Sequence, residues 1–205
     1  MASKNLHHWQ KVYAIVLALL SWSALILQLI ITNGGFFNFI SYFTILSNFL
    51  VAANLTITLT TPISSFGKYF SSVKVQSAIA LYIFIVGLVY NFVLRGIWQP
   101  TGWQLIVDNL LHVAVPILYV LYWTFFTPRG KLNWIDGLTW AYFPLSYLIY
   151  SLIRGHFTGW YPYPFLNVNE IGYPKVLLNS GLMIIAFIFI GWLLIAYNRF
   201  LRKKA

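Results

Sequence analysis

The chain has 205 residues, of which 60% are hydrophobic and 20% aromatic, whereas only 8% carry a charge. No soluble domain of this size needs so much apolar surface, and the apolar runs reach the roughly 20 residues that span a bilayer, which excludes a soluble globular domain. The net charge is +10 and there is no cysteine, which excludes disulfides, thiol chemistry and thiolate metal sites.

Six apolar segments follow one another, each long enough to cross a membrane as a helix. Gly, Pro and Asn separate them, for example in Asn33-Gly34-Gly35. The first segment lacks a small-residue cleavage site, so we expect it to stay in the mature protein. The sequence therefore predicts an all-α integral membrane bundle, one domain over residues 1–205 without a second, soluble domain. The six predicted spans are residues 10–32, 40–61, 74–97, 105–126, 134–154 and 173–198.

Lys and Arg are distributed unevenly between the two sides of this predicted bundle. Because loops rich in Lys and Arg stay in the cytoplasm, the distribution predicts that both termini are cytoplasmic. We interpret the positive charge as an orientation signal that also contacts anionic lipid head groups, and not as nucleic-acid binding. Ten of the 13 Lys and Arg residues lie on the side of the termini: Lys4, Lys11, Lys68, Lys74, Arg129, Lys131, Arg199, Arg202, Lys203 and Lys204. The other three are Arg95, Arg154 and Lys175.

Polar side chains form a stripe on the second predicted span. At 100° per residue, the first four fall within about 120° of one helical face, and two more extend that face inward. We expect the stripe to face the bundle interior, because these side chains are costly in contact with lipid. The six residues are Ser41, Thr44, Ser47, Asn48, Asn54 and Thr58.

The predicted topology brings polar residues of further spans to the same outer end of the bundle. Ionisable residues within spans usually face the bundle interior or a watery cavity. A shared pocket that opens outward accounts for all of them. The third, fourth and fifth spans and the loop that follows contribute Asn91, Arg95, Asp108, Asn109, His112, Arg154, His156 and Thr158.

Asp108 and His112 are the most informative pair, because residues four apart lie on one helical face. A carboxylate one turn from an imidazole can hold its tautomer and stabilise its protonated form, which prepares a general base for a hydroxyl proton. Thr44 lies at a similar depth and provides a hydroxyl. Pro116 predicts a kink below His112 that widens the pocket.

Plainer interpretations of the same residues stay open. A histidine within a span can simply join two helices, and a threonine can bond its own backbone. Asp108 suits a helix start, and Arg95 and Arg154 can extend to head groups. A metal site is disfavoured. Its candidates on the outer side are His112, His156 and Asp108, since His7 and His8 lie on the cytoplasmic side.

Three motifs carry a resemblance to a known family. They are FTILSN over residues 43–48, DNLLH over residues 108–112 with Pro116 following, and HFTGWYPYPFL over residues 156–166. These motifs resemble the androgen-induced-gene family of multi-pass membrane proteins, and the chain is similar to a compact bacterial member. The resemblance implies a threonine hydrolase that cleaves fatty acid esters of hydroxy fatty acids, with Thr44 as nucleophile and His112 as base. It also implies a bacterial cytoplasmic membrane.

The chain departs from the family pattern at one point. In the relatives an asparagine follows the nucleophile by three positions, whereas here Ser47 stands there and Asn48 comes one later. Both positions stay near the helix face of Thr44. The role of Asp108 as a third member of the site comes from spacing alone.

These observations together predict a lipid ester hydrolase that acts on fatty acyl esters of the membrane without cofactor or metal. Candidate oxyanion donors are Asn48, Asn109 and Arg95, and Ser47, Asp108, Arg154 and His156 are expected to line or support the pocket. One alternative is a non-enzymatic lipid-binding or transport protein that holds an anionic head group between Arg95 and Arg154. Another is a structural membrane protein whose polar residues only join helices. The sequence makes no prediction of the oligomeric state.

Overall fold

The structure is a computed structural model that describes residues 8–200, and over these residues it is helical, with no strand. Five helices are long and apolar enough to cross a membrane: His8–Ile31, Phe43–Thr60, Val73–Leu94, Gly102–Phe126 and Val168–Phe200. The prediction of an all-α, multi-pass membrane protein is confirmed to this extent. The chain divides into two compact units, Met1–Pro128 and Arg129–Ala205.

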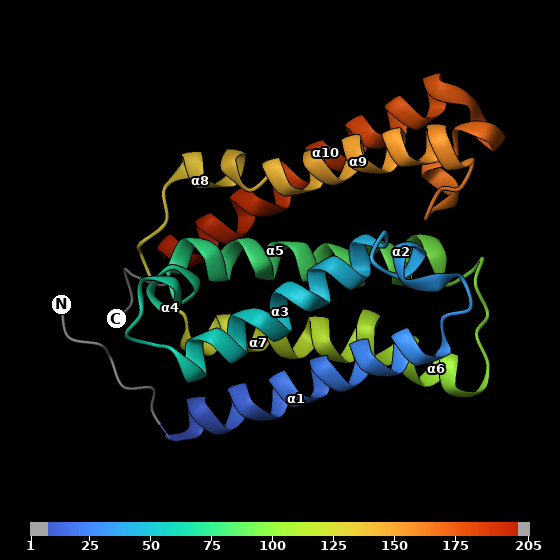
Figure 1. The fold of residues 1–205 in the computed structure, drawn as a ribbon. Coiled ribbons are helices and arrows are strands. Elements are labelled where there is room, and N and C mark those ends of the chain that lie inside the picture. Colours follow the sequence, from blue (N-terminus) through green and yellow to red (C-terminus); the bar gives the residue numbers. More distant parts are fainter. Residues whose placement is uncertain (1–7, 201–205) are drawn as a thin grey trace. The chain divides into compact units, whose positions relative to one another are not determined.

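The first unit is built around four long helices. Helix α3 packs against α1 and against α5, and α7 packs against α5 and α1 (Figure 1). The helices of this unit are α1 (His8–Ile31), α2 (Gly35–Phe39), α3 (Phe43–Thr60), α4 (Ser65–Phe70), α5 (Val73–Val89), α6 (Gly102–Asn109) and α7 (Val115–Phe126). Two π-helical turns continue α5 and join α6 to α7: η1 (Tyr90–Leu94) and η2 (Leu110–Ala114).

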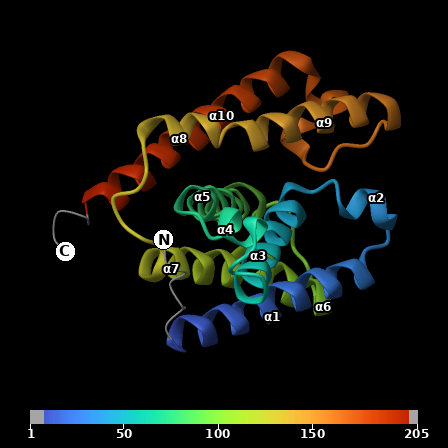
Figure 2. The same ribbon diagram turned by 60° about the vertical axis from the view of Figure 1, so that its left-hand side comes forward.

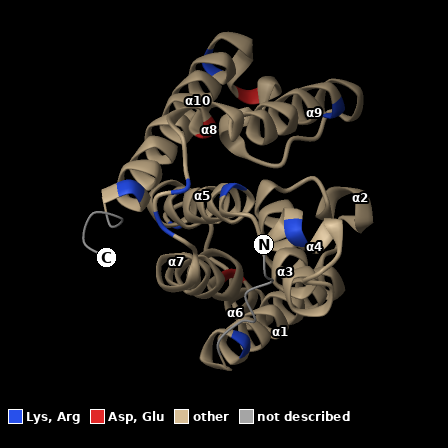
Figure 3. Cartoon of the chain, turned by 90° about the vertical axis from the view of Figure 1, so that its left-hand side faces the viewer, with Lys and Arg blue, Asp and Glu red and all other residues tan. Residues whose placement is uncertain are grey.

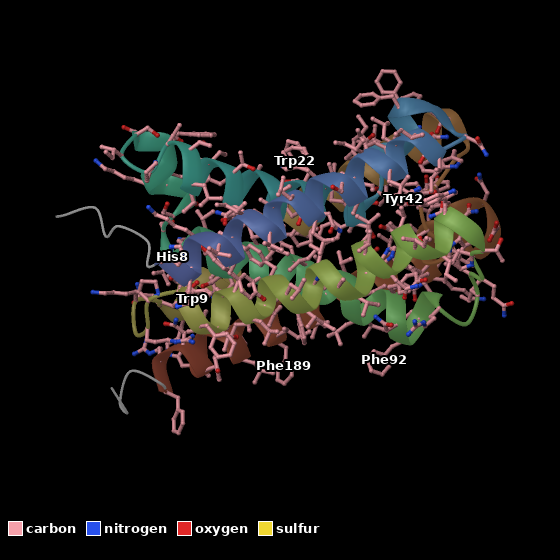
Figure 4. The ribbon with its side chains drawn as sticks, turned by 90° about the horizontal axis from the view of Figure 1, so that it is seen from below. His8, Trp9, Trp22, Tyr42, Phe92 and Phe189 are labelled. Carbon is pink, nitrogen blue, oxygen red and sulfur yellow. The ribbon has the colours of Figure 1, made fainter. Side chains whose placement is uncertain are left out.

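The outward faces of these helices are apolar. On α1, Val16, Leu19 and Ile30 are exposed, and Phe92 in η1 is 84% exposed and points away from the helices (Figure 4). Charged residues are sparse along the ribbon (Figure 3). Soluble monomers rarely expose such continuous apolar surface, whereas lipid tails cover it without cost.

The predicted polar stripe of the second span is buried. All six of its residues are buried, and Ser47, Asn48 and Asn54 are inaccessible to solvent. Asn54 donates to the carbonyl oxygen of Phe70 at 2.7 Å and accepts the hydroxyl of Tyr119 at 2.9 Å. Such bonds offset the cost of burying polar groups. The helix itself begins at Phe43, so Ser41 precedes it.

The second unit contains α8 (Trp134–Thr139), α9 (Tyr142–Thr158), the 3₁₀ turn η3 (Pro164–Leu166) and α10 (Val168–Phe200). Helix α9 lies alongside α10 (Figures 1 and 2). Within α10, Gly172 has a φ of +74°, so the helix is kinked there. This conformation favours glycine, which has no Cβ to clash.

The predicted fifth span, residues 134–154, is not one continuous helix. It is interrupted at Trp140 and Ala141, between α8 and α9. Pro144 explains the break: it has no N–H to donate to the carbonyl of Trp140, and its ring disfavours a regular helix across that point. With 17 residues, α9 is not among the five helices above.

Candidate active site

Thr44 and His112, 68 positions apart in the sequence, meet in the first unit. Thr44 lies in the first turn of α3 and is 8% exposed, and His112 lies in the middle of η2. The Oγ1 atom of Thr44 is 3.3 Å from Nε2 of His112. This separation is at the long end of the hydrogen-bond range, as is common in unliganded sites.

The other ring nitrogen identifies the tautomer of His112. Nδ1 lies 3.0 Å from the main-chain carbonyl oxygen of Asp108. Because a carbonyl oxygen can only accept, Nδ1 carries the hydrogen and Nε2 of the neutral ring presents its lone pair to Thr44. The imidazole is therefore oriented to accept the hydroxyl proton.

Pro116 frees one of the carbonyl groups of η2. In a regular helix the N–H of residue 116 would donate to the carbonyl of His112, but proline has no N–H. The amide of Asn91 takes that place, donating to the carbonyl oxygen of His112 at 3.4 Å and to that of Gly87 at 2.8 Å. Asn91 thus joins the end of α5 to the turn that carries His112.

Asn48 satisfies a second carbonyl of the same turn. The N–H of Val115 donates to Leu110 in the π register, which leaves the carbonyl of Leu111 without its regular helical donor. The side-chain amide of Asn48 donates to that oxygen at 3.1 Å and to the carbonyl oxygen of Thr44 at 2.9 Å. One buried side chain thereby holds α3 against η2 and fixes Thr44 beside His112.

Among the described residues, the carboxylate of Asp108 makes no hydrogen bond to the imidazole, whose Nδ1 is bonded to the main-chain oxygen of Asp108 instead. The carboxylate accepts hydrogen bonds from Tyr90 Oη at 3.0 Å, Trp98 Nε1 at 2.8 Å and Gln104 Nε2 at 2.9 Å. Asp108 as a whole is buried, with 3% of the residue exposed. Asp108 therefore orients His112 through its main chain and serves three other donors with its side chain.

Tyr90 covers one face of the imidazole. The ring centroids of Tyr90 and His112 are 3.9 Å apart and the ring planes differ by 12°. Both residues belong to π-helical turns, which often occur at functional sites. The imidazole is thus held by a stacked ring, a carbonyl oxygen and the Thr44 hydroxyl.

Arg95 lies at the exposed rim of this group. Its guanidinium donates to Oδ1 of Asn91 at 2.9 Å and to Oδ1 of Asn109 at 3.5 Å. The amide nitrogen of Asn109 donates to the carbonyl of Leu105, which turns Oδ1 towards Arg95. In the part of the chain that the structure describes, the acceptors of Arg95 are neutral amides, so its positive charge is not neutralised by a carboxylate.

The three predicted oxyanion donors differ in whether they keep an N–H group that a substrate oxygen could accept from. Both amide hydrogens of Asn48 are used on main-chain oxygens, so Asn48 has no N–H left for a substrate. Asn109 and Arg95 keep further N–H groups. Ser47 is buried next to Asn48, and its hydroxyl finds no hydrogen-bond partner among the described residues.

Arg154 and His156 belong to the second unit and have contacts there. The guanidinium carbon of Arg154 lies 4.6 Å from the ring centroid of Trp160. His156 is exposed and meets the ring of Phe157 edge-on. The motif over residues 156–166 forms the end of α9, a left-handed turn at Gly159 and the loop that leads through η3.

Five residues named in the sequence analysis lie outside the described residues: His7, Lys4, Arg202, Lys203 and Lys204. Among residues 8–200, no three His, Asp or Glu side chains lie close enough to hold a metal ion.

Sequence reasoning missed Tyr90, Trp98 and Gln104. Gln104 could have been predicted as a partner of Asp108, because it lies one helical turn before that residue. Trp98 resembled an interfacial aromatic residue near a span end, and nothing in the local sequence distinguishes Tyr90 from other aromatic residues of the spans.

Comparison of the chain with models of protein families, with curated proteins and with solved structures gave no match. The family resemblance of the three motifs therefore stays a prediction. The chemistry of the site is derived from its own contacts.

Proposed function

We propose that this protein is an intramembrane lipid ester hydrolase with Thr44 as nucleophile and His112 as general base. One observation carries the proposal: Nε2 of His112 is 3.3 Å from the Thr44 hydroxyl while Nδ1 is bonded to a carbonyl oxygen. A hydroxyl beside the unprotonated nitrogen of an oriented imidazole is the arrangement that nucleophilic acyl transfer needs.

The reaction has two halves. In the first, Oγ1 of Thr44 attacks the ester carbonyl carbon while its proton moves to Nε2 of His112. The tetrahedral intermediate collapses, the C–O bond to the alcohol breaks, and Nε2 returns the proton to the departing oxygen. In the second half, water attacks the acyl-threonine with its proton moving to Nε2, and the fatty acid leaves as that proton restores the Thr44 hydroxyl.

The negative oxygen of the intermediate needs hydrogen-bond donors. We assign the oxyanion to the remaining N–H groups of Arg95 and Asn109. Asn48 is excluded as a donor because both of its amide hydrogens are used.

The substrate we propose is a fatty acyl ester that enters from the membrane. The apolar outward faces of the helices support a location within lipid. We also propose six crossings in a bacterial cytoplasmic membrane with both termini inside, made by the five long helices together with α9. Its 17 residues extend about 26 Å at 1.5 Å per residue, close to the roughly 30 Å of the hydrocarbon layer.

Labelling with a fluorophosphonate probe in detergent tests the assignment. We expect the wild type to be labelled and Thr44→Ala and His112→Ala to lose the label. Thr60→Ala is a matched control, because Thr60 is an exposed threonine of the same helix bonded to its own backbone, and His8→Ala controls for an exposed histidine. Labelling that survives Thr44→Ala would remove Thr44 as the nucleophile.

One observation favours a second candidate function, lipid binding without turnover. Arg95 is exposed and held by two neutral amides, so it can pair with an anionic head group. This function predicts that anionic lipid copurifies with the wild type and with Thr44→Ala but is lost from Arg95→Gln. Thr44-dependent ester hydrolysis would exclude it as the sole function.

A further inference from the structure

We propose that Tyr90 is a positioning residue that links the buried charge of Asp108 to His112. In sites where a carboxylate contacts the imidazole, it orients the ring and stabilises the imidazolium. Here the carboxylate is bonded to Tyr90 instead, and Tyr90 is stacked on the ring. The inference rests on the proposed function, because it concerns the imidazolium that forms when Thr44 gives up its proton.

The first part of the inference concerns orientation. An imidazole held only by Nδ1 and Nε2 can still tilt about the line between these two contacts. Tyr90 prevents that movement, since its ring lies parallel to the imidazole at 3.9 Å between centroids and is itself buried. The hydroxyl fixes Tyr90 in turn, because it donates to Oδ2 of Asp108 at 3.0 Å.

The second part concerns charge. An imidazolium over the face of an aromatic ring within about 6 Å is attracted by the ring's negative face. A phenol that donates its hydrogen to a carboxylate has a more electron-rich ring, so Asp108 strengthens this attraction through Tyr90. Both oxygens of Asp108 accept hydrogen bonds, as those of an ionised carboxylate do, and its negative charge is buried where water screens it little.

Trp98 and Gln104 hold the carboxylate in place for this role. Trp98 Nε1 donates to the same oxygen as Tyr90, and Gln104 donates to the other oxygen. Gln104 also exchanges hydrogen bonds with Gln28 of α1, at 2.9 and 3.4 Å. The position of Tyr90 therefore depends on α1, α6 and the segment after η1 together.

Two substitutions separate orientation from charge, with a matched control. Tyr90→Phe keeps the stacked ring and removes the bond to Asp108, whereas Tyr90→Leu removes both. Tyr119→Phe is the control, because Tyr119 is a fully buried tyrosine of the same unit whose hydroxyl donates to Asn54 at 2.9 Å, outside the site. The measurements are kcat, KM and the melting temperature in detergent with a long-chain acyl ester.

We expect kcat to fall about 5-fold in Tyr90→Phe and about 30-fold in Tyr90→Leu, with KM within about 2-fold of the wild type. Tyr119→Phe should keep kcat within about 2-fold although its melting temperature falls as much as that of Tyr90→Phe. If kcat instead follows the melting temperature across all three variants, Tyr90 is only structural and the inference is overturned.

A second measurement does not depend on hydrolysis. Nitrogen-15 spectra of histidine-labelled protein in which His112 is the single remaining histidine report the ring tautomer. We expect one tautomer with hydrogen on Nδ1, and a mixture in Tyr90→Leu but not in Tyr119→Phe. Absence of Thr44-dependent hydrolysis in the wild type would refute the proposed function, while an unchanged tautomer in Tyr90→Leu would refute the orienting role of Tyr90.

Discussion

At the scale of single residues, the site depends on side chains that hold main-chain groups. Asn48 donates both amide hydrogens to carbonyl oxygens of Thr44 and Leu111, and Asn91 does the same for Gly87 and His112. These bonds fix the two reacting residues without contacting a substrate. The neighbouring Ser47 is equally buried but has no hydrogen-bond partner among residues 8–200.

Asn48→Ala should therefore destabilise the protein by about 2–3 kcal/mol, because it leaves the carbonyl of Leu111 buried without a donor and opens a small cavity. Ser47→Ala removes a hydroxyl that makes no hydrogen bond to the described residues and should change the free energy of unfolding by less than about 0.5 kcal/mol. Unfolding in detergent by denaturant measures both. Equal losses of unfolding free energy in Asn48→Ala and Ser47→Ala would contradict the role assigned to Asn48.

Two substitutions of Thr44 separate the hydroxyl group from the methyl group. Thr44→Val removes the nucleophilic oxygen and should lower kcat at least about 1,000-fold, whereas Thr44→Ser keeps the oxygen and should retain about a tenth of kcat. Steady-state hydrolysis of a long-chain acyl ester measures both. Equal activity of the two variants would show that the hydroxyl does not react.

At the scale of elements, the two π-helical turns are the part of the fold that the sequence could not predict. Hydrophobic periodicity gave one continuous helix for residues 105–126, and the chain is indeed helical over this range. The π register at η2 depends on Asn48 and Asn91, which come from other helices and are therefore invisible to local sequence patterns. The local sequence gives one indication, Pro116, because a proline has no N–H to donate to the carbonyl of His112, which then needs another donor.

Pro116→Ala should convert the π-helical turn η2 towards a regular α-helix. The new N–H can donate to the carbonyl of His112 in place of Asn91, so the helix becomes more regular and the melting temperature stays equal or rises. The imidazole then moves relative to Thr44, and we expect kcat to fall about tenfold. Full activity together with a raised melting temperature would contradict the importance of the turn.

The break in the predicted fifth span was readable in the sequence, because Pro144 ends the regular helix behind it. By contrast, the carboxylate of Asp108 was expected on the imidazole from its i, i+4 spacing alone. Spacing places two side chains on one face but does not decide which of several donors a carboxylate accepts. Here the carboxylate accepts from Tyr90 and Trp98, which lie outside the helix that carries Asp108.

At the scale of the whole molecule, composition alone predicted the helical membrane class, since apolar runs of this length have few other uses. The pair of Thr44 and His112 was expected from the motifs, and the structure gives the distance between them. Arg154 and His156 have their contacts in the second unit, with Trp160 and Phe157.

The proposed six crossings can be tested directly because the chain has no cysteine. Single cysteines at Lys68 and Lys131 should react with an impermeant thiol reagent only from the cytoplasmic side, and those at Gly96 and Thr158 only from the outside. Labelling of positions 131 and 158 from the same side would show that α9 does not cross.

Trapping the covalent intermediate tests the central claim most directly. A rapidly quenched turnover with a long-chain acyl ester, followed by mass spectrometry of the peptides, locates the acyl group. The account predicts an acyl group on Thr44 in the wild type and none in Thr44→Val, and no thioester can interfere in a chain without cysteine. Hydrolysis that proceeds with no acyl group on Thr44 and persists in Thr44→Val would contradict it.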